Sequence, residues 1–447
     1  MVNMKKKILL LTLIIYSTFP LAGVKWEGTL PKIAQDHKTW EILLNELLEK
    51  EMYYGALVTA YRGLLYYDNL AIKQKAYQTI VTLIDLGYPE NVLNMFVTGD
   101  IEPADNADFI NSYNFYKAIA NESKGMKKWA DDFFSNIDKD NFYKYLFYLA
   151  VQAYALNDYP KSITLLEKIL KLPLEEKHLP FIKKAARTLA RIYFKQENYL
   201  KSLDIYETFL TKLNPITPSD WLEMAWNLYY LKRYQESLGI LYNLESQVVT
   251  PPHNLENYII RALVYLDLCA TDNVEKLINK FQKTYDSAIQ GIINGKPLRN
   301  HKELLLIYSN QNKNFYDTQN AINNLMTEYN TKLKQLSKDN QPLASFIYKS
   351  EYMMLTKKIN FYLENVYNAS ATQLIMTAES LKFLKFSVMR EKFNPDTVFN
   401  NILSQDFKNS FEDIGNRGFT LIWEQQGDYW RDERNKYFGD ISNQCVK

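Results

Sequence analysis

A short pattern recurs three times in the middle of the chain and limits the possible folds more than any other feature. Each copy begins with Tyr, has Ser three residues later and continues with apolar residues at helical spacing: 159–166, 199–206 and 234–241. Tyr159, Tyr199 and Tyr234 stand 40 and 35 residues apart, close to one helical hairpin per unit. Periods of about 20–50 residues are typical of repeat proteins. The pattern therefore predicts a series of helical hairpins.

Small residues complete the pattern. Nine positions before each Tyr lies an alanine: Ala150, Ala190 and Ala225. Antiparallel helices approach closely only where small side chains face each other, and these Ala and Ser positions supply that contact. One hairpin cannot bury its apolar face alone, so successive hairpins are expected to stack into a superhelical solenoid.

Composition supports an all-α fold. Gly and Pro number only 14 each among 447 residues, well below the usual shares of about 7 % and 5 %. Sandwiches, barrels and propellers need a turn every 8–12 residues or so. We therefore expect an all-α superhelical solenoid of antiparallel helix-turn-helix repeats that ends in a long helical hairpin and an aromatic tail.

The three units resemble the tetratricopeptide repeat, most clearly over residues 143–247. In the third unit, Trp221 stands at the first aromatic position of that family and Ala225 at its small position. The resemblance implies a right-handed superhelix. The segment Gly427-Asp428-Tyr429-Trp430-Arg431-Asp432-Glu433 is similar to the endings of some exported tetratricopeptide proteins of the bacterial cell envelope. The units depart from the family by having Ser at the second small position and connections of unequal length.

The chain divides into five expected parts. They are a signal peptide (1–23), divergent N-terminal helical repeats (24–140), the repeat core (141–290), a C-terminal helical region (291–415) and an aromatic tail (416–447). The leader has three lysines, an apolar run, Pro20 and then Leu21-Ala22-Gly23, the order typical of secretory signal peptides. It predicts a periplasmic or secreted protein. No later stretch has the roughly 20 apolar residues of a transmembrane helix.

Charge and motifs argue against several functions. The formal net charge is +2 (53 basic minus 51 acidic residues), too small an excess for nucleic-acid binding by bulk electrostatics. Two cysteines and four scattered histidines show no metal-ligand spacing. No phosphate loop or nucleophile motif occurs. We therefore expect a non-enzyme that uses neither a cofactor nor a metal.

The dipeptide Glu379-Ser380 raises one enzymatic alternative, a superhelix related to lytic transglycosylases. In those enzymes a catalytic Glu-Ser pair precedes a Gly-rich substrate loop, whereas here residues 381–390 contain no glycine. The acid would therefore lack its cleft. The alternative that remains is a peptidoglycan or glycan binder, or a remnant of such a superhelix.

The two cysteines, Cys269 and Cys445, could form one disulfide in an oxidising compartment. The alternative is two separate thiols, with Cys269 inside an apolar helix. The tail from Trp423 to Phe438 has five aromatic residues among charges. It is either a cap for the end of the solenoid or a docking segment.

The first helix of each hairpin is expected to line a concave, partner-binding face. The residues proposed for this groove are Arg187, Arg191, Lys195, Trp226, Tyr229 and Tyr230. The three basic residues lie at i, i+4 and i+8 on one helix face. They would attract an acidic extended peptide, unless they are solvated or paired with Glu197 and Glu223. The sequence thus predicts a non-catalytic scaffold that binds a protein partner, an extended peptide or an envelope-complex subunit.

Overall fold

The computed structural model describes residues 37–67, 69–88, 107–139, 142–175, 178–210, 217–244, 254–309, 312–393, 438–439 and 441–445. The predicted signal peptide and the aromatic cluster of residues 423–437 lie outside these ranges. The described residues are helical, with no strand among them. The prediction of an all-α solenoid is confirmed.

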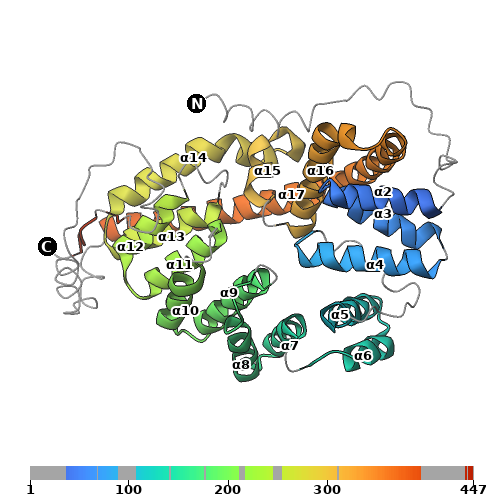
Figure 1. Ribbon diagram of the computed structural model, residues 1–447. Coiled ribbons are helices and arrows are strands. Elements are labelled where there is room, and N and C mark those ends of the chain that lie inside the picture. The colour runs from blue at the N-terminus through green and yellow to red at the C-terminus, as the bar shows by residue number, and fades with distance from the viewer. Residues whose placement is uncertain are drawn as a thin grey trace, which may run out of the picture.

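The helices of the first part of the chain are α2 (His37–Glu49), α3 (Tyr53–Tyr66), α4 (Leu70–Asp85), α5 (Ala107–Ser123) and α6 (Lys127–Ser135). The repeat core contains α7 (Tyr143–Ala155), α8 (Tyr159–Leu170), α9 (Leu179–Lys195), α10 (Tyr199–Ile205) with the π-turn η3 (Tyr206–Leu210), α11 (Pro218–Tyr230) and α12 (Tyr234–Asn243). Then follow α13 (Leu255–Asp267), α14 (Thr271–Ile293), η4 (Leu298–Asn300), α15 (Lys302–Tyr308), α16 (Lys313–Lys332), η5 (Leu333–Gln335) and α17 (Asn340–Phe393). Consecutive helices pack against each other along an arc (Figure 1).

The same turn closes successive helices. A residue with a left-handed backbone follows the cap residue at positions 51, 87, 125, 157, 197, 232, 269 and 295. In the turn that follows α9, the N–H of Glu197 donates to the carbonyl of Phe194, and the N–H of Asn198 donates to the carbonyl of Tyr193. Both hydrogen bonds are 2.9 Å long. This pair of bonds satisfies carbonyls that the end of the helix would otherwise leave without donors. The turn is therefore a structural repeat that extends beyond the three units visible in the sequence.

The small residues of the sequence pattern lie where the two helices of each hairpin touch. All six are fully buried: Ala150, Ser162, Ala190, Ser202, Ala225 and Ser237. In two hairpins the serine hydroxyl donates to the alanine carbonyl twelve residues earlier, from Ser162 to Ala150 at 2.8 Å and from Ser237 to Ala225 at 2.9 Å. Serine at this position therefore fits the close contact and also adds a hydrogen bond across it.

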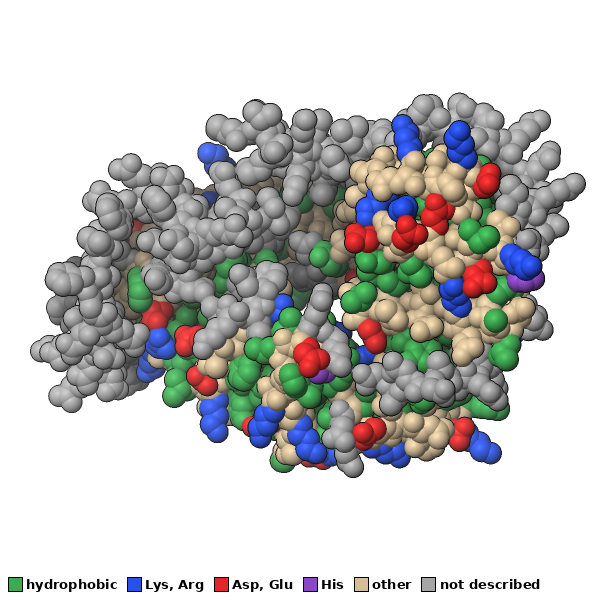
Figure 2. All heavy atoms as spheres, viewed as in Figure 1, with side chains coloured by type: hydrophobic (Ala, Val, Ile, Leu, Met, Phe, Trp, Pro, Cys, Tyr) green, Lys and Arg blue, Asp and Glu red, His purple; other side chains and the backbone are tan. Residues whose placement is uncertain are grey.

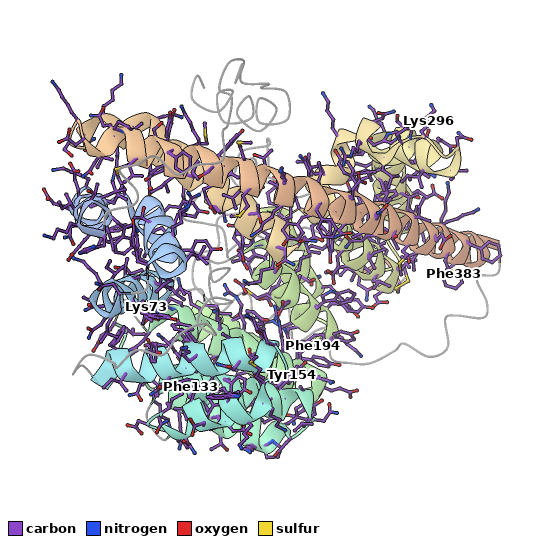
Figure 3. The ribbon with its side chains drawn as sticks, turned by 90° about the vertical axis from the view of Figure 1, so that its right-hand side faces the viewer. Lys73, Phe133, Tyr154, Phe194, Lys296 and Phe383 are labelled. Atoms are coloured by element: carbon purple, nitrogen blue, oxygen red, sulfur yellow. A yellow bond between two sulfur atoms is a disulfide. The ribbon has the colours of Figure 1, made fainter. Side chains whose placement is uncertain are left out.

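Helix α17 connects the two ends of the arc. Its first half shares a core with α2–α6 and α16, through side chains such as Leu343 and Leu355. Its second half shares another core with α13–α15, through Leu374 and Leu381. The core of the repeat units between them, α7–α13, contains none of the described α17 side chains, residues 340–387. Figure 3 shows α17 as one long rod that crosses the molecule, with Phe383 near its far end.

A polar latch holds α16 and α17 to the N-terminal hairpin. The Glu328 carboxylate accepts hydrogen bonds from the N–H groups of Tyr54 (2.8 Å) and Gly55 (2.9 Å) in the first turn of α3. Four residues along α16, the Lys332 ammonium donates to the carbonyls of Lys50 and Glu51, just after α2. An anion thus meets a helix N-terminus and a cation meets a helix C-terminus, the favourable orientation for both helix dipoles.

Candidate partner-binding surface

The predicted groove residues come from the first helices of two neighbouring hairpins. Arg187, Arg191 and Lys195 lie along one face of α9, and Trp226, Tyr229 and Tyr230 lie in the last turns of α11. The structure brings these two sets close together, because Phe194, next to Lys195, packs against Tyr230 at 5.6 Å between ring centroids.

Arg187 forms a two-point ion pair with Asp220. Its Nε lies 2.6 Å from Oδ1 and its Nη2 lies 2.8 Å from Oδ2, and the Asp220 side chain has no exposed surface. The N–H and hydroxyl of Thr217 also donate to this carboxylate, which completes a capping box at the start of α11. Burial alone would raise the pKa of Asp220, but the bonds from Arg187 and Thr217 outweigh it and the pKa is lowered. Arg187 therefore holds two hairpins together.

Arg191 is paired in the same way with Glu223. Its Nη2 lies 2.6 Å from Oε1 and its Nε lies 2.9 Å from Oε2. The buried hydroxyl of Tyr206 also donates to Glu223. The alternative left open for the basic stripe, pairing with Glu223, thus holds for Arg191, and Arg187 has a partner that the sequence analysis did not name. Neither guanidinium is left as an uncompensated charge.

Lys195 differs from the two arginines because its described neighbours are aromatic rings and an amide. Its ammonium lies 5.5 Å from the ring centre of Tyr154 and 5.4 Å from that of Tyr159, both on the previous hairpin. The side-chain oxygen of Asn157 is 3.5 Å away. A hydrogen bond with Tyr159 raises the pKa of Lys195, so the ammonium stays charged at neutral pH.

Aromatic side chains form a row that crosses three hairpins. Tyr154 contacts Tyr159 on the first, Phe194 contacts Tyr199 on the second, and Trp226, Tyr229, Tyr230 and Tyr234 contact one another on the third. Tyr199 stacks on Tyr230 at 4.7 Å with an interplanar angle of 10°, which joins the second hairpin to the third. Tyr154 and Phe194 lie near each other at the ends of neighbouring helices (Figure 3). Tyr230 is the most exposed ring, with 47 % of its surface accessible.

The sequence contained one usable signal for the missed partner of Arg187. Thr217-Pro218-Ser219-Asp220 has the form of a capping box, in which the acid three residues after the cap turns back toward the helix start. The box predicts that Asp220 lies at the start of the helix over 218–230. Its position beside α9 follows from the packing of the two hairpins.

Other candidate chemistry is accounted for by the fold. Glu379 is exposed on α17, and the neighbouring Ser380 hydroxyl donates to the Met376 carbonyl of its own helix at 2.9 Å. Within the described ranges, no three His, Cys, Asp or Glu side chains gather as metal ligands. On the face shown in Figure 2, described charges of both signs are interspersed rather than separated.

The question left open for the cysteines is answered by a disulfide between Cys269 and Cys445, with the two Cα atoms 5.0 Å apart. It joins the corner between α13 and α14 to the end of the chain. Residues 438–439 and 441–445, the described part of the tail, lie against the repeat core rather than beyond it.

Comparisons with known proteins supply no relative. No protein-family model, curated protein or solved structure matches this chain. Among the described helices, none combines the length and the apolar character that a bilayer crossing requires.

Proposed function

We propose that this chain is an exported, non-catalytic scaffold that binds protein partners of the bacterial cell envelope through the first helices of its repeat core. The observation that carries the proposal is the aromatic row from Tyr154 to Tyr234, whose members come from three hairpins. Rings of the second and third hairpins touch directly, and Lys195 links the rings of the first hairpin to the second. Aromatic side chains are enriched in protein interfaces because they offer a large contact area at a small cost in conformational entropy. A row along successive repeats suits an extended peptide.

The ion pairs of Arg187 and Arg191 change which residues are expected to contact a partner protein. Arg187 and Arg191 are matched by Asp220 and Glu223, so they position α9 against α11 and do not provide a free basic stripe. Lys195 is the cation directed along the row. We propose that the rings contact the partner peptide and that Lys195 pairs with one carboxylate on it.

A glycan is the competing ligand, and the ring geometry speaks against it. Sugars bind to proteins by stacking on open aromatic faces. Tyr230 instead stacks on Tyr199 at 4.7 Å and on Trp226 at 5.9 Å, so these rings occupy one another's faces. The Trp226 Nε1–H group also donates to Glu256, at 2.6 Å.

Capture from the protein's own cells tests the proposal. The mature chain is used as bait beside a Lys195→Glu/Tyr230→Ala variant and a control, Lys161→Glu, which makes the same charge change on the exposed surface of α8. We expect the double variant to recover at least tenfold less partner with an unchanged circular dichroism spectrum, and the control to behave as the parent. The proposal would be overturned if the double variant recovered as much partner as the parent. It would also be overturned if the parent sedimented with purified peptidoglycan and Tyr230→Ala abolished that sedimentation.

A further inference from the structure

The end of the chain occupies a defined strip on the repeat core. The N–H of Gly439 donates to the carbonyl of Gln235 on α12 at 2.8 Å. The side-chain amide of Gln235 donates in return to the carbonyl of Ile441, at 3.2 Å. The N–H of Gln444 donates to the carbonyl of Leu268, at 2.9 Å. Three bonds to the backbone of a non-helical segment are what a site for an extended peptide provides.

Side-chain size is also specified along this strip. A Cβ atom at Gly439 would lie 2.6 Å from the Cβ of Leu238, closer than such atoms approach, so only glycine fits there. Two residues later, Ile441 packs against the apolar core of the repeat units. The strip therefore accepts a peptide with no side chain at one position and an aliphatic side chain two positions on.

The disulfide fastens this segment at its far end. Cys269 stands at the left-handed position of the turn after α13, with φ of 55°, where other hairpins have Asn157, Glu197 and Lys232. This position lies at an exposed corner, and both Cys269 and Cys445 are half-buried rather than enclosed. A small dithiol can therefore reach the bond. Exposed disulfides are the labile ones among protein disulfides.

We propose that Gln235, Leu238 and the Leu268 carbonyl form a docking strip for an extended peptide, that residues 438–439 and 441–445 are its resident ligand, and that a dithiol reductant makes this ligand displaceable. One reductant thiolate attacks Sγ of Cys445, and Cys269 leaves as a thiolate. The second reductant thiol attacks the mixed disulfide, which releases Cys445 as a thiolate and oxidises the reductant to a cyclic disulfide. Two electrons pass from the dithiol to the protein.

Reduction removes the covalent tie, and the three hydrogen bonds and Ile441 then hold the segment alone. The tail remains attached through residues 394–437, so it still competes with an incoming peptide at a high effective concentration. A partner that presents Gly and an aliphatic residue two positions apart would displace it. This strip shares no residue with the aromatic row, so the inference does not depend on the proposed function.

A labelled peptide with the sequence of residues 438–444 serves as the probe, and fluorescence anisotropy measures its binding to full-length protein. Three forms are compared: the oxidised parent, Cys269→Ser/Cys445→Ser, and the same double variant with Gly439→Val, whose tail cannot seat beside Leu238. We expect no saturable binding to the parent, weak binding to the double variant and at least tenfold tighter binding to the triple variant. A control peptide with valine at the Gly439 position should bind at least tenfold more weakly than the parent peptide.

Equal binding to the oxidised parent and the triple variant, or equal binding of both peptides, would overturn the proposal. A covalent dimer on a non-reducing gel of the parent would also do so, because the tail would then occupy the strip of a second copy. Amide exchange of the parent gives a test that needs no variant. A dithiol should raise the exchange rates of Gly439 and Gln444 at least tenfold, and unchanged rates would refute the release.

Discussion

Serine at the second small position has two roles in two of the three hairpins. It is small enough for α7 and α8, or α11 and α12, to touch, and its hydroxyl is bonded to a carbonyl of the facing helix. Ser202 is equally buried in the middle hairpin, but no described residue forms a hydrogen bond with its hydroxyl. A buried hydroxyl without a partner costs stability, whereas a bonded one contributes about 0.5–1.5 kcal/mol.

Replacing these serines by alanine should therefore have opposite effects. Ser162→Ala and Ser237→Ala should each lower the free energy of unfolding by about 1 kcal/mol. Ser202→Ala should leave it unchanged or raise it, because it removes a desolvated hydroxyl. Urea unfolding followed by circular dichroism measures the three variants under one condition. A loss at Ser202 equal to the loss at Ser162 would show that all three hydroxyls contribute alike.

The two arginines of α9 should also differ. Arg187→Met leaves Asp220 buried without its cation, and such a loss typically costs about 3–5 kcal/mol. Arg191→Met affects a pair in which the Arg191 side chain is 52 % exposed, and exposed pairs contribute about 0–1 kcal/mol. In thermal unfolding, the melting temperature of Arg187→Met should be well below that of Arg191→Met. Equal melting temperatures would mean that the Asp220 pair stabilises no more than a surface pair does.

At the scale of elements, the sequence predicts the helices well and their long-range partners poorly. The divergent helical repeats predicted over residues 24–140 include the antiparallel pairs α2 with α3 and α5 with α6. These boundaries follow from local causes, namely apolar spacing and turn residues. The contact of Glu328 with α3 follows from a meeting of segments more than 270 residues apart, for which the local pattern has no signal.

The meeting of α3 with α17 depends on a glycine. A side chain at Gly55 would collide with the ring of Tyr348, which also donates to Glu328 at 2.6 Å. Alanine normally stabilises a helix by about 1 kcal/mol relative to glycine. Here we expect Gly55→Ala to destabilise the protein by about 1–3 kcal/mol, the usual cost of overpacking.

Chemical denaturation measures this change, and amide exchange in α3 shows whether the latch has opened. A stabilised Gly55→Ala protein would mean that α3 and α17 are not held this closely.

The sequence signal for the partner-binding groove was also incomplete. The i, i+4, i+8 spacing places the three basic residues on one face of α9, but the acidic partners of Arg187 and Arg191 come from another hairpin.

For the whole molecule, the main departure from expectation is closure. The sequence predicts a solenoid that continues into a C-terminal helical hairpin, and α16 and α17 do form that hairpin. However, α17 turns back along the arc and joins its first core to its last. An open solenoid can change its curvature by small shifts between repeats, whereas here both ends of the arc are fixed to one helix.

The stability of this closed arrangement should depend on pH, and buried acids set the direction of the dependence. Burial raises the pKa of Glu328 and of Glu351 above the ordinary value of 4.5, and at Glu328 it outweighs the hydrogen bonds from Tyr348, Tyr54 and Gly55, which favour the carboxylate. The folded state therefore binds these protons more tightly than the unfolded state, so their contribution to stability is complete below pH 4.5 and is lost as pH rises through the raised values. Glu46 and Asp220 have lowered pKa values, so their contribution to folding stability is lost only as pH falls below the ordinary range of a carboxyl group.

We therefore expect the melting temperature to rise as pH falls from 7 to 5. Glu351→Gln, which imitates the protonated acid, should raise the melting temperature at pH 7 and reduce its dependence on pH. Glu49→Gln, an exposed position on α2, is the matched control and should keep the parent's dependence. A melting temperature that falls between pH 7 and 5 would show that the buried acids do not control this range.

The latch also sets an order of events during synthesis. The first helix turn of α3 receives its buried carboxylate from a residue 274 positions later. A chain made at about 5–20 residues per second reaches Glu328 roughly 14–55 s after Tyr54. During that interval, the apolar side chains of the α2–α3 hairpin lack their packing partners on α16 and α17. Exposed apolar side chains of this kind are what chaperones recognise. The N-terminal hairpin, although made before the repeat core, is thus completed only after residue 328 has been made.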